Sequence, residues 1–323
     1  MDANLVGKNT ARRFCWALII GCFWVGSGGP AQSGPAAVRD PGLRAELLRR
    51  VAEDQDIARE YYPKEAVGRL DAALIARREK SLADNAARIK QIVQQHGWPG
   101  PELVGRDGSD AAFLLVQHSD NAFRKEMLPY VRSAYEAFQT SGQNYALLQD
   151  IVLLAEGKPQ VYGTRLKPFR QWPDHTPVPE PISDPAHVDK RRAEVGLLPL
   201  SLYLDDMKQM RYPGTPLKPF EERVRRLPGG DLMLGAIAYL VRLKEQDRLP
   251  GIGKTDHGFF PYSGFTGPDR FPLSRTESFS KNNSDSTYYY TVVKPSPEAG
   301  WQLEAAWCRD VSGRIVQRFP VQR

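Results

Sequence analysis

Cysteine is scarce in this chain, and its distribution excludes a disulfide-stabilised fold. The 323 residues contain three cysteines, and two of them, Cys15 and Cys22, lie in an apolar N-terminal segment. The remainder of the chain contains only Cys308, which cannot form an internal disulfide. We therefore expect the fold to be held by side-chain packing, with Cys308 as a small buried residue in a strand.

Signatures of catalysis and of nucleic-acid binding are also missing. The sequence contains no Gly-x-Ser-x-Gly nucleophile elbow, no His-Glu-x-x-His zinc motif and no paired cysteine and histidine ligands. Its 44 basic and 38 acidic side chains give a net charge of +6, but no dense Lys/Arg patch is interleaved with aromatic residues. Nucleic acid is therefore not an expected partner, and neither a covalent nucleophile nor a metal site has a recognisable motif.

Long hydrophobic runs are limited to the N-terminus, where the pattern predicts an export signal. Three basic residues precede an apolar run at 14–26, and Ala-Gln-Ser at 31–33 fits a small-x-small cleavage site. Residues 19–22 resemble a lipobox, so lipid anchoring at Cys22 is an alternative, although the apolar run continues beyond that cysteine. We expect removal of residues 1–33 and a periplasmic or extracellular protein, with no transmembrane domain beyond the signal.

The rest of the chain changes its pattern near residue 211, which predicts two domains of an α+β protein. After a linker at 34–41, residues 42–210 show helical periodicity and one short strand candidate, so a mainly helical domain is expected. Residues 211–323 combine one apolar helix with alternating polar and apolar residues, which is typical of a small antiparallel sheet packed on a helix.

Hydrophobic spacing predicts the individual elements. The second helix is expected to begin near Glu65, with Val67 and Leu70 on its inner face, and to end at Gly97. Helices are expected over residues 42–62, 65–96, 110–117, 120–141, 145–155, 184–196, 200–210 and 231–248. Strands are expected over residues 159–164, 287–294, 301–308 and 314–321, the last three as a three-stranded meander. The core side of the 301–308 strand is expected to be Trp301, Leu303, Ala305 and Trp307.

Four polar residues interrupt the inner stripes of the helical part, and they are candidates for one buried polar centre. They are Asp54, Asn85, His118 and Asp150, each on or at the end of a separate apolar stripe. An unpartnered buried polar group costs about 1–3 kcal/mol, so pointing the four at each other would satisfy them most simply. Asp120 and Tyr162 could complete the cluster. Arg59 and Arg191 are the expected ion-pair partners of the two buried aspartates, in that order.

Several short strings stand out in a fixed order along this part of the chain. They are Asp-Gln at 54–55 with Arg59, Asn85, Gly-Trp-Pro at 97–99, Val-Gly at 104–105, Gln-His-Ser-Asp at 117–120, Asp150, Gln-Val-Tyr-Gly-Thr at 160–164, Asp-Pro at 184–185, Val-Asp at 188–189, Arg-Arg-Ala-Glu-Val-Gly-Leu at 191–197, Pro-Leu at 199–200 and Tyr203. In this order they resemble DUF6624, an uncharacterised bacterial domain-of-unknown-function family, over residues from about 46 to 207.

The resemblance implies a fold and a map of the site, and it implies no activity. No family is suspected for residues 211–323. The chain departs from the family pattern at two positions: Arg165 stands where glutamine is usual, and Ile151 stands where arginine is usual. If those side chains touch a ligand, this member has an altered site.

Three interpretations of the polar centre are compatible with the sequence. In the first, the network fixes only the helix register, and His118 is structural. In the second, His118 is the general acid–base of a hydrolase that uses water as its nucleophile, and a metal held by His118 and Asp120 is a variant of this mechanism. The candidate catalytic residues are His118, Asp54, Asp120 and Asp150.

The third interpretation, which we favour, is binding of a small or anionic ligand or of an envelope component. The candidate ligand-binding residues are Asn85, Trp98, Gln117, Tyr162 and Arg191. The sequence assigns no cofactor and no oligomeric state.

Overall fold

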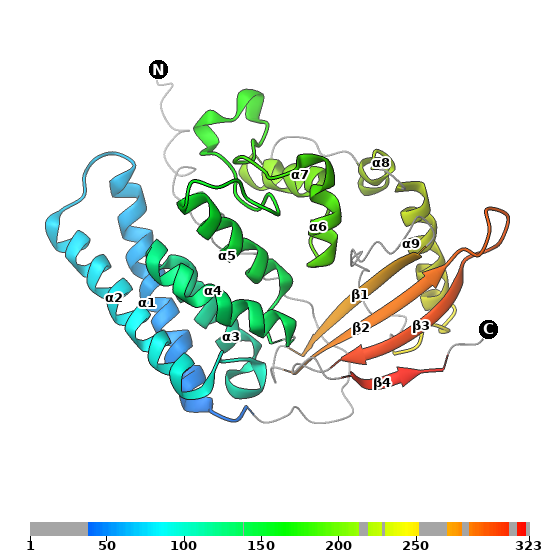
Figure 1. Cartoon of the computed structure of the whole chain (residues 1–323), viewed down its shortest axis with the longest axis horizontal. Helices are drawn as coiled ribbons and strands as arrows, with labels where there is room; N and C mark the ends of the chain where they lie inside the picture. The colour runs from blue at the N-terminus through cyan, green and yellow to red at the C-terminus, as the bar shows by residue number, and fades with distance from the viewer. Residues whose placement is uncertain are drawn as a thin grey trace, which may run out of the picture.

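The structure is a computed structural model that describes residues 38–137, 139–212, 219–227, 230–251, 270–279, 284–309 and 315–320. The predicted export signal, the alternative lipidation site at Cys22 and residues 34–37 of the predicted linker lie outside these residues. Helices come first along the chain and a sheet comes last (Figure 1). This order confirms the α+β class predicted from the sequence.

Five helices enclose the core of the first part of the chain. They are α1 (Pro41–Glu65), α2 (Ala72–His96), α3 (Pro101–His118), α4 (Asn121–Glu136) and α5 (Gly142–Ala155). The hairpin of α1 and α2 forms one end of the molecule, and α3 packs against α1 (Figure 1). Leu47, Ile89 and Val104 have no exposed surface in this core. Burying side chains of this size contributes about 1.5–3 kcal/mol each.

Capping groups fix where these helices begin and end. The carboxylates of Asp71 and Asp120 each accept a hydrogen bond of 2.8 Å from the backbone amide three residues on. The second helix therefore starts at Ala72 and not near residue 65 as predicted, and Val67, expected on its inner face, is 63% exposed. Gly97, with a φ of 71°, ends α2 as predicted.

The third helix begins earlier than predicted. Pro101 occupies its first turn, and the chain bends at Gly105, where φ is 74°, before the helix continues to His118. The predicted start at residue 110 is therefore wrong. Ser109, the residue before it, is buried within the helix, and its hydroxyl accepts a hydrogen bond of 3.3 Å from the indole N–H of Trp98.

A long loop follows α5 and leads to two further helices. They are α6 (Val188–Glu194) and α7 (Leu200–Arg211), and the loop before α6 contains short 3-10 turns. The strand predicted at 159–164 is wrong, because its backbone makes only one parallel bridge, from Gln160 to Ile182. Leu202 of α7 packs in the C-terminal core. The domain boundary at residue 210 stays a prediction, and α7, which precedes it, shares a core with the sheet.

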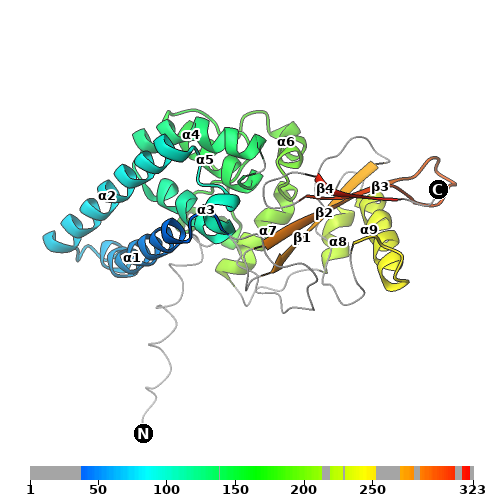
Figure 2. The same cartoon turned by 90° about the horizontal axis from the view of Figure 1, so that it is seen from below.

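The C-terminal part is an antiparallel sheet covered by helices. Its elements are α8 (Phe220–Arg225), α9 (Gly230–Glu245), β1 (Arg270–Phe279), β2 (Ser284–Val293), β3 (Gln302–Arg309) and β4 (Ile315–Phe319). The strands pair in the order β1-β2-β3-β4, and α8 and α9 lie on one face (Figure 2). The three predicted strands are confirmed, and β1 is additional. The proline at position 272 obscured β1 in the sequence, yet an edge strand tolerates proline.

A β-bulge changes which residues of β3 face the core. Thr291 pairs with Ala305 and Val292 pairs with Leu303, so Glu304 has no cross-strand partner. The predicted alternation holds for Trp301 and Leu303, which pack against the core, and then shifts by one residue. Beyond the bulge, Ala306 is buried where Ala305 and Trp307 were expected. Cys308 is buried and unbridged, as predicted.

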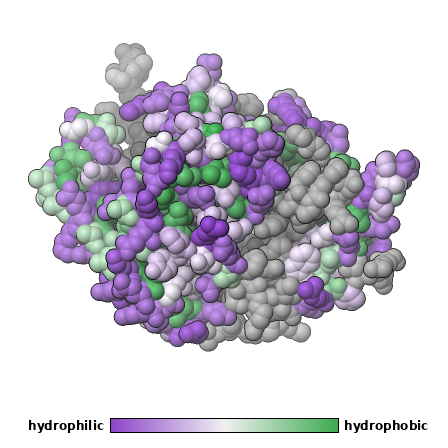
Figure 3. All heavy atoms as spheres, in the orientation of Figure 1, coloured by the Kyte–Doolittle hydropathy of each residue, from purple (hydrophilic) through white to green (hydrophobic). Residues whose placement is uncertain are grey.

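Within the part of the chain that the structure describes, no helix has both the length and the apolar character needed to cross a membrane. The face seen in Figure 3 is a mixture of hydrophilic and hydrophobic residues, with hydrophilic ones prominent over the helices. Large exposed apolar side chains are scattered, among them Val67, Tyr130, Phe169 and Val241.

Candidate functional site

The C-terminal end of α3 carries a histidine bound to a buried aspartate. His118 is the last residue of α3, and Asp54 lies on the inner stripe of α1, the helix against which α3 packs. His118 Nδ1 and Asp54 Oδ2 are 2.5 Å apart, and the two side chains are 11% and 4% exposed. The predicted ion pair of Asp54 with Arg59 is wrong, because Arg59 pairs with Asp56 on the exposed face of α1.

The other ring nitrogen of His118 is open. Nε2 is buried and has no hydrogen-bond partner among the described residues. Because Nδ1 faces a carboxylate, it carries a proton in either charge state of the ring, so Nε2 is an acceptor in the neutral ring and a donor in the imidazolium. Gln55, beside Asp54 in the sequence, also buries its amide oxygen and nitrogen with no partner in the described part. Each open group of this kind costs about 1–3 kcal/mol unless another molecule satisfies it.

A half-buried arginine binds the backbone of the residue that precedes this histidine. Asp120 caps α4, whose first turns carry Arg124. Arg124 Nε donates to the backbone carbonyl of Gln117 at 2.8 Å, and Nη1 donates to Asn121 Oδ1 at 2.7 Å. Burial lowers the pKa of the Arg124 guanidinium, and the nearby charge of Arg165 lowers it further. Gln117 and Asp120 therefore position the site through a carbonyl and a helix cap.

The end of α1 supplies a tyrosine to the same neighbourhood. Tyr62 follows Asp54 by about two turns, and it is among the groups that act on the pKa of Arg124. Arg78 of α2 donates from Nη2 to the Tyr62 hydroxyl oxygen at 3.0 Å, and its guanidinium carbon lies 4.9 Å from the centre of the Tyr62 ring. Since that oxygen accepts from Arg78, the hydroxyl proton of Tyr62 can be donated elsewhere.

Asp150 forms a separate network, in which every carboxylate contact goes to one loop. Its Oδ1 accepts from the amides of Val161 and Tyr162 at 2.7 and 3.0 Å. Its Oδ2 accepts from the amide and hydroxyl of Thr164 at 2.9 and 2.8 Å. Asp150 has no exposed surface, so its charge is balanced by these N–H and O–H dipoles. The carboxylate thereby holds the Tyr-Gly-Thr loop against α5, and the predicted ion pair with Arg191 is wrong.

Two arginines of α6 hold the same loop from its other side. Arg191 Nε donates to the carbonyl of Val161 at 3.0 Å, and Arg192 Nη1 donates to that of Tyr162 at 2.6 Å. Arg192 is 2% exposed, and burial lowers its pKa to about 10. Tyr162 is buried beside Tyr145. Burial is the main cause that raises the pKa of Tyr162, and Tyr145 raises it further. Arg191 and Tyr162, predicted to bind a ligand, thus both have structural partners.

Asn85 lies in a third environment, between α1 and α2. Its Oδ1 accepts from Arg50 Nη1 at 3.1 Å, and its Nδ2 lies 3.5 Å from Ser81 Oγ. The expectation that four polar residues share one centre therefore holds for Asp54 and His118 only. Asp150 and Asn85 are each satisfied by other groups.

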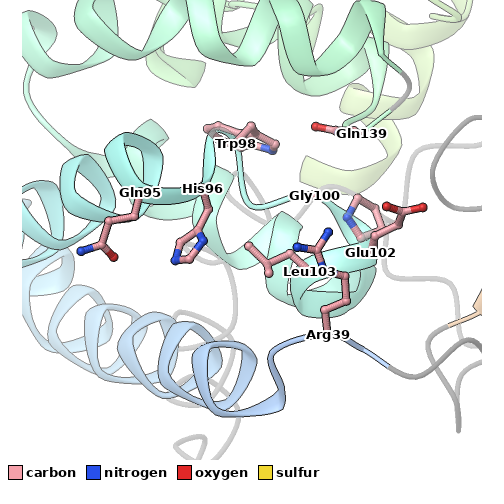
Figure 4. Close-up of a pocket in the computed structure, with 9 residues that line it drawn as sticks. Arg39, Gln95, His96, Trp98, Gly100, Glu102, Leu103 and Gln139 are labelled. Carbon is pink, nitrogen blue, oxygen red and sulfur yellow. The ribbon is translucent and has the colours of Figure 1, made fainter.

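Trp98 lies at the opposite end of α3 from His118, beside a pocket of about 320 Å³. The helical stretch after the bend at Gly105, which ends at His118, alone spans roughly 18 Å at 1.5 Å per residue. Figure 4 shows the lining side chains, which come from the segment before α1, the end of α2, the start of α3 and the segment after α4. The pocket is therefore distinct from the His118 site, and ligand binding by Trp98 stays a prediction.

Three residues of the His118 site were not predicted from the sequence. Arg124 could have been suspected, because a cation in the first turns of a helix is opposed by the helix dipole and therefore needs a reason. Gln55 belongs to the Asp-Gln string and was noted only for its resemblance. Tyr62 carried no signal, since its place depends on where α1 ends.

The described residues contain no group of three or more His, Cys, Asp or Glu side chains placed to hold a metal ion.

Comparison with known proteins adds a family and no function. The model of a family of unknown function, DUF6624, matches residues 41–212, which run from α1 to α7. This confirms the resemblance drawn from the short strings. No curated protein and no solved structure matches the chain.

Proposed function

The chain belongs to DUF6624, a family of unknown function, and on that premise we propose that it binds a small anionic ligand at the end of α3. The observation that carries the proposal is the buried Nε2 of His118, which has no partner in the described part while Asp54 holds Nδ1. Buried polar atoms in proteins are nearly always satisfied by protein, water or a bound molecule. A ligand oxygen that accepts from an imidazolium N–H would satisfy Nε2.

The charges around His118 favour an anion as that ligand. His118 ends a helix, where the dipole favours positive charge. Arg124 adds a guanidinium whose hydrogen-bond acceptors, the Gln117 carbonyl and the Asn121 amide, are both neutral. The buried carboxylate of Asp54 is already engaged by Nδ1. The other nearby carboxylate, Asp120, accepts from the amide of Phe123, so both carboxylates are engaged while N–H groups of Arg124 are left for a ligand.

Calorimetric titration with inorganic phosphate, sulfate, acetate and citrate tests the proposal. The His118→Asn variant is expected to weaken binding of the best anion at least tenfold, because the ring and its Nε2 are lost. The matched control is His187→Asn, since His187 also bonds an aspartate, Asp184, but is 69% exposed. Equal affinities for wild-type protein and His118→Asn, or no binding of any of the four anions, would contradict the proposal.

A second candidate function is hydrolysis with His118 as a general base. The same pair of atoms favours it, because an aspartate at Nδ1 orients the ring and leaves Nε2 to take a proton from water. Turnover of p-nitrophenyl phosphate or p-nitrophenyl acetate that is lost in His118→Asn and kept in His187→Asn would favour the enzyme. Anion binding without turnover would favour the binding protein.

We also propose that the protein acts outside the cytoplasm. The support is the sequence of residues 1–33, with its basic start, apolar run and small-x-small end. The mass of the mature protein separates the two routes. A chain that begins after residue 33 supports cleavage, whereas a lipid-modified chain that begins at Cys22 supports anchoring.

A further inference from the structure

Building on the proposed function, we propose that Arg124 and Arg165 form a two-arginine clamp for a doubly charged oxyanion, either inorganic phosphate or the phosphate group of a monoester. The clamp names the chemical class that the His118 site selects. It is built from two segments that are far apart in the sequence, the start of α4 and the loop after α5.

Arg124 is held in place without being neutralised. Its Nε and Nη1 are fixed by the Gln117 carbonyl and the Asn121 side chain, at 2.8 and 2.7 Å. Neither acceptor carries a charge, and the contact to Gln117 places the guanidinium beside the backbone of His118. The remaining N–H groups of the fork are left for a ligand.

Arg165 is positioned by its backbone. Gln160, which has no exposed surface, accepts from the amide of Arg165 and donates to its carbonyl, both at 2.9 Å. Asp150 fixes the preceding residue, Thr164, through its amide and hydroxyl. The guanidinium itself makes no hydrogen bond or ion pair to the described residues. A rigid backbone thus presents a free guanidinium.

Two contacts bring these segments together. Lys125, next to Arg124, forms an ion pair of 2.7 Å with Glu156 at the end of α5, so the start of α4 lies beside the end of α5. Asp150 then folds the loop that ends at Arg165 back onto α5. Consistent with this placement, the charge of Arg165 opposes that of Arg124.

The opposing charges near Arg124 are few. Asp120 and Tyr62 act on it favourably, but less strongly than burial and Arg165 act against it. Asp120 Oδ1 is already engaged with the amide of Phe123 as the cap of α4. Two guanidinium groups repel each other, and a dianion bound by both would relieve that repulsion. Guanidinium forks also match the paired oxygens of phosphate.

Isothermal titration calorimetry at pH 7.5 and low salt tests the clamp, with inorganic phosphate, phenyl phosphate and acetate as the probes. Wild-type protein is expected to bind at least one phosphate probe and to prefer it to acetate. Arg124→Gln and Arg165→Gln are each expected to weaken binding at least tenfold. Arg165→Lys is expected to bind with intermediate affinity, because the charge stays while the fork is lost.

Arg132→Gln is the matched control, because Arg132 is on the same helix but is exposed and paired with Glu136. Its affinity is expected to equal that of wild type. Tighter binding of phenyl phosphate than of inorganic phosphate identifies a monoester site, and the reverse order identifies free phosphate. Thermal unfolding of each variant checks that it is folded.

Phosphate affinities that are the same in wild type, Arg124→Gln and Arg165→Gln would overturn the clamp. Acetate binding that depends on His118, without any phosphate binding, would also overturn it and would leave the proposed function standing. Loss of binding in His118→Asn together with no effect of either arginine variant has the same meaning. Binding that depends on the arginines but not on His118 would support the clamp and contradict the role of His118.

Discussion

Two buried polar regions of this molecule differ in how completely they are satisfied. The Asp150 region directs both carboxylate oxygens to the loop at 161–164, and α6 closes that loop from the other side. The His118 region leaves Nε2 and the Gln55 amide buried with no partner in the described part, and the two groups that accept hydrogen bonds from Arg124 are neutral. Both regions look alike in the sequence, where each is a polar residue on an apolar stripe.

The difference separates a structural role from a functional one. A satisfied network holds segments in place, and nothing remains for it to bind. An open group under the same burial destabilises the fold by about 1–3 kcal/mol until a ligand completes it. We infer that the Asp150 network holds the loop after α5 in place and that the His118 region binds the ligand.

Among these substitutions, Asp150→Asn should lower the free energy of unfolding most. A small effect would contradict the contrast between a structural Asp150 network and a functional His118 region. The amide keeps the size of the carboxylate but turns N–H donors toward the backbone amides of the loop. We expect the free energy of unfolding to fall by about 2–4 kcal/mol, measured by denaturant titration. Asp231→Asn, at a site that is 86% exposed, is the control and should change little. A loss below about 0.5 kcal/mol for Asp150→Asn would show that the network is not structural.

Glu46→Gln should have a smaller effect, because its network is nearer the surface. Glu46 joins α1 to α2 by accepting from Arg88 Nε and Nη2, both at 2.8 Å, and from Arg50 Nε at 2.8 Å. The hydrogen bond from Arg88 is the main reason that the pKa of Glu46 falls to about 2. We expect the substitution to lower the free energy of unfolding by roughly 1–2 kcal/mol at pH 7.

The pH dependence of that loss follows from the sign of the pKa shift. The folded pKa of about 2 lies below the ordinary value of 4.5, so the stabilisation is complete above pH 4.5 and is lost as the pH falls toward 2. The difference between wild type and Glu46→Gln should therefore shrink over this range. Glu53→Gln, in an exposed pair with Arg49, is the control. A difference that stays constant down to pH 2 would argue against the ion network.

The fold was predictable where periodicity is strong and less so where single contacts decide. Repeated apolar spacing located α1, α7 and three strands, because an element that buries one face repeats apolar residues along its whole length. The start of α2 depends on one cap, Asp71, and the core side of β3 depends on one bulge at Glu304. Nothing in the alternation of β3 marks that bulge, so the prediction was wrong beyond it.

The site was predictable in its members and not in their grouping. The sequence identified Asp54, His118 and Asp150 as polar residues of the interior; Asp54 pairs with His118 Nδ1, and Asp150 binds the loop after α5. Grouping them needed the path of the loop after α5, which was predicted as a strand. That segment is instead a loop whose amides and hydroxyl donate to Asp150. The Asp150 carboxylate is therefore satisfied by the loop, separately from the pair of Asp54 and His118.

Nitrogen NMR of the His118 ring, during titration with inorganic phosphate, phenyl phosphate and acetate, tests the central claim most directly. The spectrum reports the protonation and hydrogen bonding of each ring nitrogen separately. We predict that Nδ1 stays protonated and bound to Asp54 throughout, while the Nε2 resonance shifts with the anion that binds and shifts less in Arg124→Gln. An Nε2 resonance that none of these anions moves, in folded wild-type protein, would contradict the account.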